Sequence, residues 1–286
     1  MRLLGHVLLC FILLLLTLSM GYTADREIMM GMVSFNEEEV VDDSLQWTDY
    51  SDRMISFSGY SWRVKGRHDN ERYEPGGNYY SNDSRDVYVD DKGFLHLSVV
   101  YRDGKWWSSE IVAEEVLGYG QYIFQLDSRV DKLDKNLVMD LHLYEYQASN
   151  EHKDRQNVHN AFYLQFSRWQ DDINKPARYV CPPKRLENRH CFDFNLSNDA
   201  ASTHSFRWAS NRIECKSWYG LRKHPTESDM ITYWSYSGSE VPRGKPRVHM
   251  AFWLNGDKPH DNESHEIVIR SFRFEPLRRD SKPMGH

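Results

Sequence analysis

The sequence contains little that points to a membrane-embedded, helical or nucleic-acid-binding protein. Its 286 residues hold one long apolar run, VLLCFILLLLTL, from Val7 to Leu18. Segments with a sustained 3.6-residue apolar period are missing, which excludes a helical bundle. There is no basic block, and the formal net charge of −6 argues against nucleic acid as a partner. No internal repeat or low-complexity linker divides the chain, so we expect one folded domain.

The apolar run has the features of a secretory signal peptide. Met1 and Arg2 provide a short basic start, and small residues follow the run. The run is shorter than the roughly 20 residues that a spanning helix requires. We therefore expect a signal peptide over residues 1–24, cleaved after Gly21 or Ala24, a secreted protein, and no membrane span after cleavage. The alternative is an uncleaved anchor.

The remaining chain is predicted to have three parts. Residues 25–50 are acidic and lack clear periodicity, so we interpret them as an N-terminal extension that adds at most an edge strand. Residues 51–277 form the expected domain, and residues 278–286 form a C-terminal tail.

Cysteines are few. Cys10 lies in the apolar run, which leaves Cys181, Cys191 and Cys215. In an oxidising compartment we expect a Cys181–Cys191 disulfide, closing the short loop CPPKRLENRHC, and an unpaired Cys215. The alternative is that all three thiols are free. Three sequons predict glycosylation at Asn82, Asn195 and Asn262 in surface loops.

Short alternating segments fill the domain. They include FSGYSWRVK, VYVDDKGFLHLSVVY, GQYIFQLDS, NLVMDLHLYEY, HSFRWAS, RVHMAFWL and HEIVIRSFRFEP. Each is rich in β-branched or aromatic residues and is bounded by turn residues, as at Asp91-Lys92-Gly93. This pattern predicts an all-β sandwich of antiparallel sheets. Aromatic residues make up 14% of the chain, a value typical of sheet proteins and also of proteins that stack on sugars.

One predicted strand, NAFYLQFSRW at residues 160–169, has two different faces. Phe162, Leu164 and Phe166 alternate with a second set, Ala161, Tyr163 and Gln165. The period of two places the three large apolar side chains on one face, toward a core. The other face carries a methyl group, a phenol and an amide.

The order of the segments resembles glycoside hydrolase family 16, the laminarinase-like hydrolases. The resemblance rests on GYSWRVK, GGNYYS, LGYGQYIFQL, FSRW, MAFWLNG and EIVIRSFRFEP, and it covers most of residues 55–276. It implies a concanavalin A-like jelly roll of two antiparallel sheets, one of them curved into a sugar-binding cleft. Calcium binding on the convex sheet is common among such proteins, but no residues here identify a calcium site. No cofactor is expected.

The resemblance also locates the expected catalytic strand. When FSRW sets the register, the family's nucleophilic Glu, its middle Asp and its acid/base Glu fall on Ala161, Tyr163 and Gln165. A retaining glycosidase needs one carboxylate to attack the sugar and another carboxyl group to protonate the leaving oxygen. Ala161 cannot attack, and the Gln165 amide cannot cycle a proton near neutral pH. The resemblance therefore predicts a member that lacks the catalytic carboxylates.

Asp140 and His142 are the candidates for relocated catalysis. They lie two residues apart on the segment NLVMDLHLYEY and therefore share a face. An Asp beside a His is an acid/base pair in many enzymes. The structural interpretation, which we favour, is a hydrogen-bonded polar pair that fills the space left by the missing carboxylates.

The expected cleft retains groups that bind sugars. The resemblance places Asn78 and Tyr80 where relatives contact substrate. Stacking and hydrogen bonding are predicted for Asn78, Tyr80, Trp106, Trp107, Tyr163, Gln165 and Trp169. For each Trp the alternative is core packing, which we expect for Trp62, Trp208 and Trp253.

Three functions remain open at this level. The first is a secreted glycan-binding protein without catalysis, whose partner is a polysaccharide such as a β-glucan. The second is an active β-glucan hydrolase with relocated acids. The third is an extracellular structural protein that binds no sugar. The fold cannot choose among them, because function belongs to the site.

Overall fold

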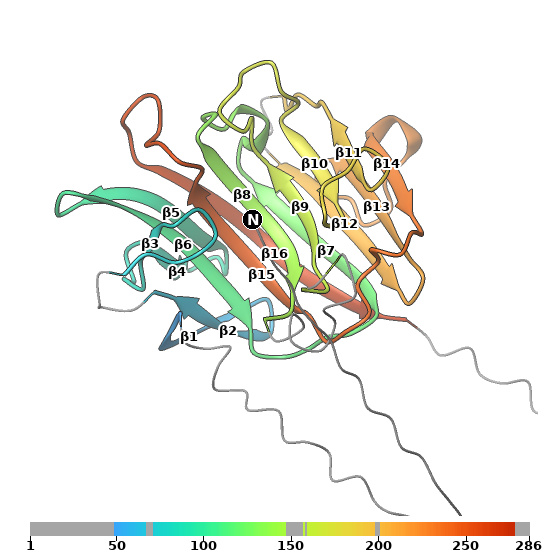
Figure 1. Ribbon diagram of the computed structural model, residues 1–286, viewed down its shortest axis with the longest axis horizontal. Coiled ribbons are helices and arrows are strands. Elements are labelled where there is room, and N and C mark those ends of the chain that lie inside the picture. Colours follow the sequence, from blue (N-terminus) through green and yellow to red (C-terminus); the bar gives the residue numbers. More distant parts are fainter. Residues whose placement is uncertain (1–48, 67–70, 147–156, 158, 198–200, 278–286) are drawn as a thin grey trace, which may run out of the picture. The chain divides into compact units, whose positions relative to one another are not determined.

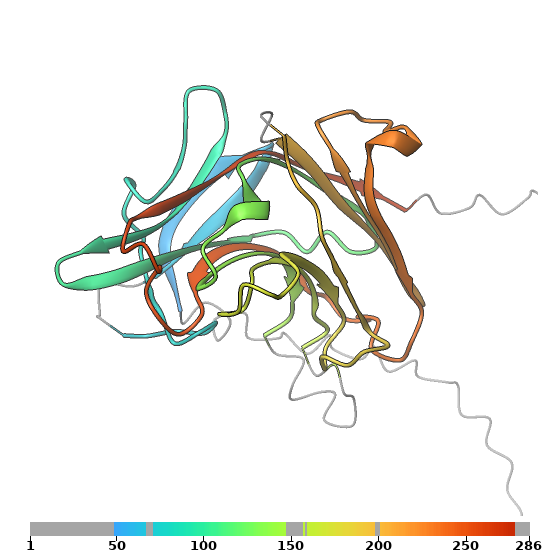
Figure 2. The same ribbon diagram turned by 90° about the horizontal axis from the view of Figure 1, so that it is seen from above.

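The chain folds as an antiparallel β-sandwich of the jelly-roll type (Figure 1). The computed structural model describes residues 49–66, 71–146, 157, 159–197 and 201–277. All of them belong to one compact unit, Asp43–His286. Figure 2 shows the two sheets as separate layers. Within the described residues, no helix combines the length and the apolar character needed to cross a membrane.

One layer, here called the front sheet, carries the strand with two different faces. Its strand order is β11-β10-β9-β8-β15-β6-β2-β1. The bounds of these strands are β1 Tyr50–Phe57, β2 Tyr60–Lys65, β6 Lys105–Ala113, β8 Leu137–Tyr144, β9 Phe162–Phe166, β10 Ala177–Val180, β11 Arg189–Phe192 and β15 Arg247–Leu254. The two-residue strand β3, Tyr79–Tyr80, pairs with β6 in parallel.

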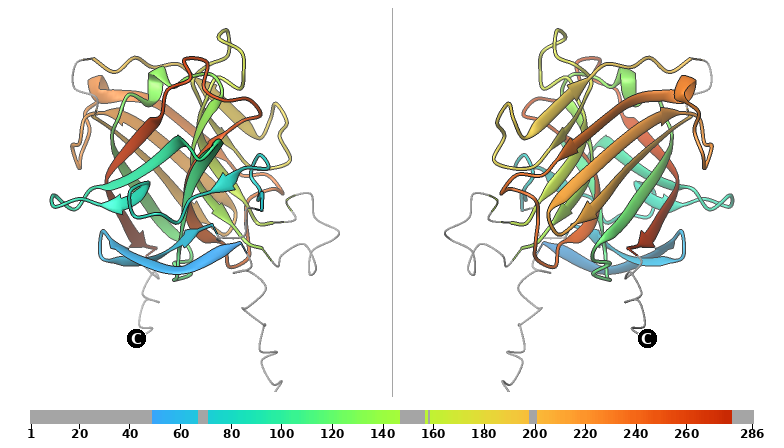
Figure 3. Two further views of the ribbon diagram at one scale, coloured as in Figure 1. Left: turned by 90° about the vertical axis from the view of Figure 1, so that its left-hand side faces the viewer. Right: turned by 90° about the vertical axis from the view of Figure 1, so that its right-hand side faces the viewer.

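The other layer, the back sheet, has the order β14-β13-β12-β7-β16-β5-β4. Its strands are β4 Val87–Val89, β5 Leu95–Arg102, β7 Gly120–Asp127, β12 Ala201–Ala209, β13 Arg212–Tyr219, β14 Met230–Tyr236 and β16 His265–Pro276. The right-hand view of Figure 3 shows β12, β13 and β14 side by side. Two short 3₁₀ turns complete the described elements: η2 Val130–Lys132 and η3 Glu227–Asp229.

The β5–β6 hairpin joins the two layers. Strand β6 pairs with β15 through Ser109↔Phe252 and with β5 through Trp107↔Val100. Strand β5 then continues into the back sheet by pairing with β16. The hydrogen-bonded ladder therefore runs without a break from one layer to the other.

The core lies between the sheets, and β9 contributes to it as predicted. Phe162, Leu164 and Phe166 are fully buried. The Phe162 ring lies 4.7 Å from that of Phe206 on the back sheet, and the Phe166 ring lies 4.7 Å from that of His204. Full burial of such side chains stabilises the fold by about 1.5–3 kcal/mol each. This contact fixes which face of β9 points away from the core.

Other sequence expectations about the core and the turns are confirmed. Trp62 and Trp208 are fully buried in the core. The turn between β4 and β5 contains Gly93, whose φ of 81° is one that glycine adopts at little cost.

The expected Cys181–Cys191 disulfide is wrong: both cysteines are free, and so is Cys215. Arg178 pairs with Cys191 across β10 and β11, and the Arg178 side chain points to the outer face of the front sheet. Cys181 instead lies in the core, three residues after Arg178. The alternation of side chains along β10 and β11 thus separates the two thiols. Cys215 is also buried in the core.

The predictions for the signal peptide, for residues 25–48 of the extension and for the tail 278–286 lie outside the described residues. The last expected residue of the extension, Tyr50, begins strand β1.

Candidate functional site

Strand β9 presents two of the expected catalytic positions on the outer face of the front sheet, and the third, Ala161, immediately precedes the strand. Tyr163 pairs with His142 and Gln165 pairs with Asp140 across β8. Tyr163 is half-buried, Gln165 is 7% exposed and Ala161 is buried. The structure therefore brings Tyr163 and Gln165 together with Asp140 and His142, the two candidates for relocated catalysis. The predicted Asp140–His142 pairing is looser than a hydrogen bond, with Nδ1 and Oδ1 3.5 Å apart.

Gln165 is held at both ends of its amide. Its Nε2 donates to Asp140 Oδ2 at 2.9 Å, and its Oε1 accepts from Arg178 Nε at 2.8 Å. Burial raises the pKa of Asp140 to about 7, and the hydrogen bond from Gln165 opposes that rise. Burial also lowers the pKa of Arg178 to about 10. The amide thus connects a carboxyl group that titrates near neutrality to a cation, and it has little freedom to turn toward a ligand.

A second buried network lies on the same face, two strands away from Asp140. Glu110 on β6 accepts a hydrogen bond from Lys65 Nζ at 3.0 Å. Its other oxygen accepts from the Tyr50 hydroxyl at 2.8 Å and lies 2.8 Å from His249 Nδ1. All four side chains are buried. Burial tends to raise the pKa of Glu110, but Lys65 and then His249 outweigh it and hold the pKa below its usual range.

This second network was not predicted from the sequence. Its members come from β1, β2, β6 and β15, and only β1 and β2 are close together along the chain. A local signal existed, because Lys65 and Glu110 lie directly beside apolar residues in the segments WRVK and SSEIVA. A charge buried inside a strand requires a partner. The pattern does not say which strand supplies that partner.

Two imidazoles connect the networks. His142 and His249 pair across β8 and β15, with ring centroids 4.7 Å apart. The Tyr163 ring lies 5.3 Å from His142 on the other side. Burial lowers the pKa of both histidines. Glu110, His142 and His249 each offer one ligand atom within 4.8 Å of the others, and these three are the metal-ligand cluster of the described residues.

Trp169 lies three residues after the end of β9 and is half-buried. The Arg178 guanidinium covers one side of its ring at 3.5 Å, and Lys184 Nζ lies 5.4 Å from the ring centre. The Trp253 ring approaches it edge-on at 6.2 Å. Trp253 is buried as predicted, but it packs on the outer face with Tyr80 instead of in the core between the sheets.

Asn78 and Tyr80 lie below the surface that a sugar would contact. Asn78 donates to the backbone of Pro75 and Leu254, and Tyr80 donates its hydroxyl hydrogen to Pro75. The Tyr80 ring is 1% exposed, and Lys65 Nζ lies 4.7 Å from its centre. In this conformation both residues support the face and do not offer a free edge or ring to a ligand.

Trp106 and Trp107 make their contacts elsewhere. The Trp106 ring lies 5.3 Å from Tyr101, within the β5–β6 hairpin. The Trp107 ring lies 5.6 Å from Tyr79, and its Nε1 donates to the Arg102 carbonyl. The structure does not bring these two rings to Tyr163 or Trp169. The glycosylation candidates Asn195 and Asn262 are exposed, and Asn82 is half-buried.

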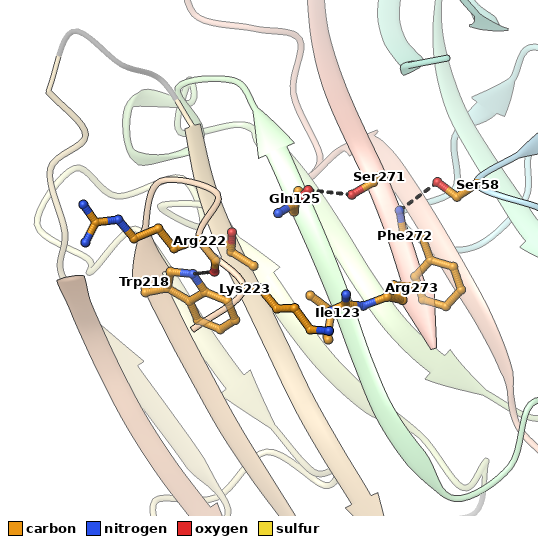
Figure 4. Close-up of a pocket in the computed structure, with 10 residues that line it drawn as sticks. Ser58, Ile123, Gln125, Trp218, Arg222, Lys223, Ser271, Phe272 and Arg273 are labelled. Carbon is orange, nitrogen blue, oxygen red and sulfur yellow. Dashed lines mark hydrogen bonds between the residues drawn. The ribbon is translucent and has the colours of Figure 1, made fainter. Parts of the chain in front are cut away.

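A cavity of about 380 Å³ lies on a different part of the molecule (Figure 4). It is lined by Ile123 and Gln125 of β7, Trp218 of β13, Ser271 and Arg273 of β16, and the loop residues Arg222 and Lys223. These residues belong to the back sheet and its loops. The cavity is therefore separate from the face that β9 presents.

Comparisons with known proteins support the fold, but they do not place the chain in a family. No family model matches the chain, and no curated protein matches it by sequence. The β-glucanase of Bacillus licheniformis is similar in structure, with a TM-score of 0.53, 14% identity, and coverage of 81% of this chain and 96% of that one.

Two mycobacterial structures are similar as well. A pseudo β-1,3-glucanase and immunostimulatory antigen of Mycobacterium tuberculosis has a TM-score of 0.53 at 8% identity, covering 76% of this chain and 91% of that one. A glycosyl hydrolase family protein of Mycobacterium fortuitum has a TM-score of 0.52 at 13% identity, covering 75% and 91%. The chain has the concanavalin A-like fold of the β-glucanases.

Proposed function

We propose that this chain is a secreted glycan-binding protein that has a glucanase fold and does not hydrolyse its ligand. The observation that carries the proposal is the outer face of β9, which presents Tyr163 and Gln165, with Ala161 immediately before the strand. Ala161 has no group that can attack the sugar, and the Gln165 amide cannot exchange a proton near neutral pH. Burial raises the pKa of the Tyr163 phenol, which makes it a poor replacement for a carboxylate. The basic start and the apolar run at the N-terminus support secretion.

One observation favours the second candidate, a hydrolase with relocated acids. Asp140 and Glu110 lie on one face, and their environments move their pKa values in opposite directions. Such divergence is common in acid and base pairs of glycosidases. However, Asp140 and Glu110 are each only 2% exposed, and Lys65 already bonds Glu110. A sugar cannot reach either carboxyl group without displacing its neighbours, so we favour binding without hydrolysis.

Tyr163 and Trp169 are the side chains we assign to glycan binding. Both are half-buried, and both extend from β9 or its end toward the outer face. Gln165 contributes less than the sequence predicts, because both ends of its amide are already bonded. An aromatic ring that stacks on a flat ligand contributes about 1–3 kcal/mol, a value taken from stacking on nucleic-acid bases.

A binding and turnover experiment tests the proposal. The purified protein is applied to a glycan array and incubated with β-1,3- and mixed β-1,3/1,4-glucans, and reducing ends are measured. We expect binding without new reducing ends. Tyr163→Ala and Trp169→Ala should each weaken binding by about 1–3 kcal/mol. Tyr233→Ala, which removes an exposed ring from β14 of the back sheet, is the control and should leave binding unchanged.

Other outcomes identify the other candidates. Hydrolysis by the unmodified protein that disappears in Asp140→Asn would establish the relocated site. A folded protein that neither binds nor cleaves any glycan would support a structural role instead.

A further inference from the structure

Three neighbouring strands bring Glu110, His142 and His249 together. His249 of β15 pairs directly with His142 of β8, and its neighbour on the same face, Ala251, pairs with Glu110 of β6. Because alternate residues of a strand share a face, the three side chains point to the same side of the sheet. Their candidate ligand atoms lie within 4.8 Å of one another, and all three residues are buried.

Each histidine of this cluster has one ring nitrogen without a hydrogen-bond partner among the described residues. Within the described part of the chain, His142 Nδ1 and His249 Nε2 are buried and have no hydrogen-bond partner, and neither has Asp140 Oδ1. Burial lowers the pKa of both histidines, and the charge of Glu110 opposes that effect. Neutral imidazole is the form that binds a metal ion. A buried polar atom without a partner is costly, and a rearrangement of the two rings that gives these nitrogen atoms partners would relieve that cost.

We propose that Glu110, His142 and His249 form a binding site for a divalent transition-metal ion of the zinc type. Two histidines and one glutamate are a donor set that Zn²⁺ takes in catalytic sites, where a fourth position stays open for water. Ligand atoms about 2.1 Å from a tetrahedral ion lie about 3.4 Å from one another. The side chains therefore need to close by little more than an ångström, which rotamer adjustments supply without moving the strands.

Asp140 is placed to support such a site as a positioning residue. Its unpartnered Oδ1 lies 3.5 Å from His142 Nδ1. A small approach would make Nδ1–H donate to this oxygen, which leaves His142 Nε2 as the metal ligand. A carboxylate that accepts from the second nitrogen of a histidine ligand is the usual outer support in zinc sites.

Lys65 is the rival cation for Glu110. Its ammonium group bonds Glu110 Oε2 at 3.0 Å, whereas the histidine side of the cluster meets Oε1. The ion and the ammonium group can therefore use different oxygen atoms of one carboxylate, with the ion replacing the Tyr50 hydroxyl that donates to Oε1. Their mutual repulsion weakens the site compared with a cluster that has no lysine. The test must show whether the metal ion binds despite Lys65.

The experiment uses the untagged protein, stripped with EDTA, dialysed against Zn²⁺ and analysed for bound metal by mass spectrometry. We expect one zinc ion per chain, and the loss of that ion in His142→Gln and in His249→Gln. His190→Gln and Cys191→Ser are the controls, because both residues lie on β11 outside the cluster, and both variants should keep the ion. Circular dichroism establishes that each variant is folded.

A second measurement does not depend on any variant. Co²⁺ in place of Zn²⁺ should give the visible absorption of a four-coordinate site with nitrogen and oxygen ligands and no thiolate band. The absence of stoichiometric metal, or binding that survives in His142→Gln or disappears in Cys191→Ser, would overturn the proposal and leave Lys65 as the cation of this carboxylate. The result is independent of glycan binding, so a failure here does not bear on the proposed function.

Discussion

At the residue scale, two opposing effects act on the pKa of Asp140. Burial favours its neutral form, while the hydrogen bond from Gln165 and the nearby Arg178 favour its ionised form. Burial prevails, and its pKa rises from an ordinary value of about 3.9 to about 7. Between these two values the folded protein holds a proton that the unfolded chain has lost. The contribution of Asp140 to stability therefore falls as the pH rises from about 4 to about 7.

The substitution Asp140→Asn should remove the dependence of stability on pH that Asp140 causes. The Asn carbonyl can still accept from Gln165 Nε2 and carries no charge. The wild type should lose stability relative to the variant as the pH rises. From pH 4.5 to pH 8, the difference in unfolding free energy between the two proteins should move in favour of the variant by on the order of 3 kcal/mol, since one pKa unit corresponds to about 1.4 kcal/mol. Urea unfolding at both pH values in the presence of EDTA measures the difference. A stability difference that is the same at both pH values would show that Asp140 titrates normally.

At the element scale, the two faces of strand β9 carry different kinds of side chain. Its core face is set by Phe162, Leu164 and Phe166, which are buried between the sheets, whereas its outer face contacts side chains of the front sheet. Substituting the outer face does not disturb the packing that fixes the register. We therefore expect the outer face to accept carboxylates.

Restoring the three acids tests this reasoning. In the triple variant Ala161→Glu, Tyr163→Asp and Gln165→Glu, we expect slow but detectable hydrolysis of β-1,3- or mixed-linkage glucan. The rate should be low, because Arg178 lies beside position 165 and would lower the pKa of the new acid, whereas an acid catalyst needs a raised one. Reducing-end assays over long incubations provide the measurement. A folded variant that binds glucan and yields no product would argue against a decayed glycosidase.

The sequence predicted elements better than contacts between them. Alternation along β9 and the turn at Gly93 are local properties, and both are confirmed. Asp140 and His142 were found because they lie on one strand. The Lys65–Glu110–His249 network was missed, because strand order alone decides that β2, β6 and β15 are neighbours. The disulfide failed for a related reason: a short separation in sequence says nothing about which side of the sheet each thiol faces.

At the scale of the whole molecule, the three described cysteines differ in how deeply they are buried. Cys181 and Cys215 are buried, and burial raises the pKa of both thiols, whereas Cys191 is half-buried. Only the thiolate form reacts. In the native protein a thiol reagent should therefore label Cys191 first.

Labelling without reductant tests this expectation. In denaturant, all three thiols should react, and peptide mass spectrometry identifies each site. If Cys181 and Cys191 remain unlabelled until a reductant is added, the pairing expected from the sequence would be correct after all.

The continuous ladder through β5 and β6 has a consequence for how the molecule opens. Two sheets held together by side chains alone can slide or separate while each keeps its own hydrogen bonds. Here the layers cannot part without breaking the pairing of Val100 with Trp107 or bending the strands that carry it. Amide hydrogens along this hairpin should consequently exchange with solvent only when the whole sandwich unfolds, whereas those of the outermost strands β11 and β14 exchange through local fraying.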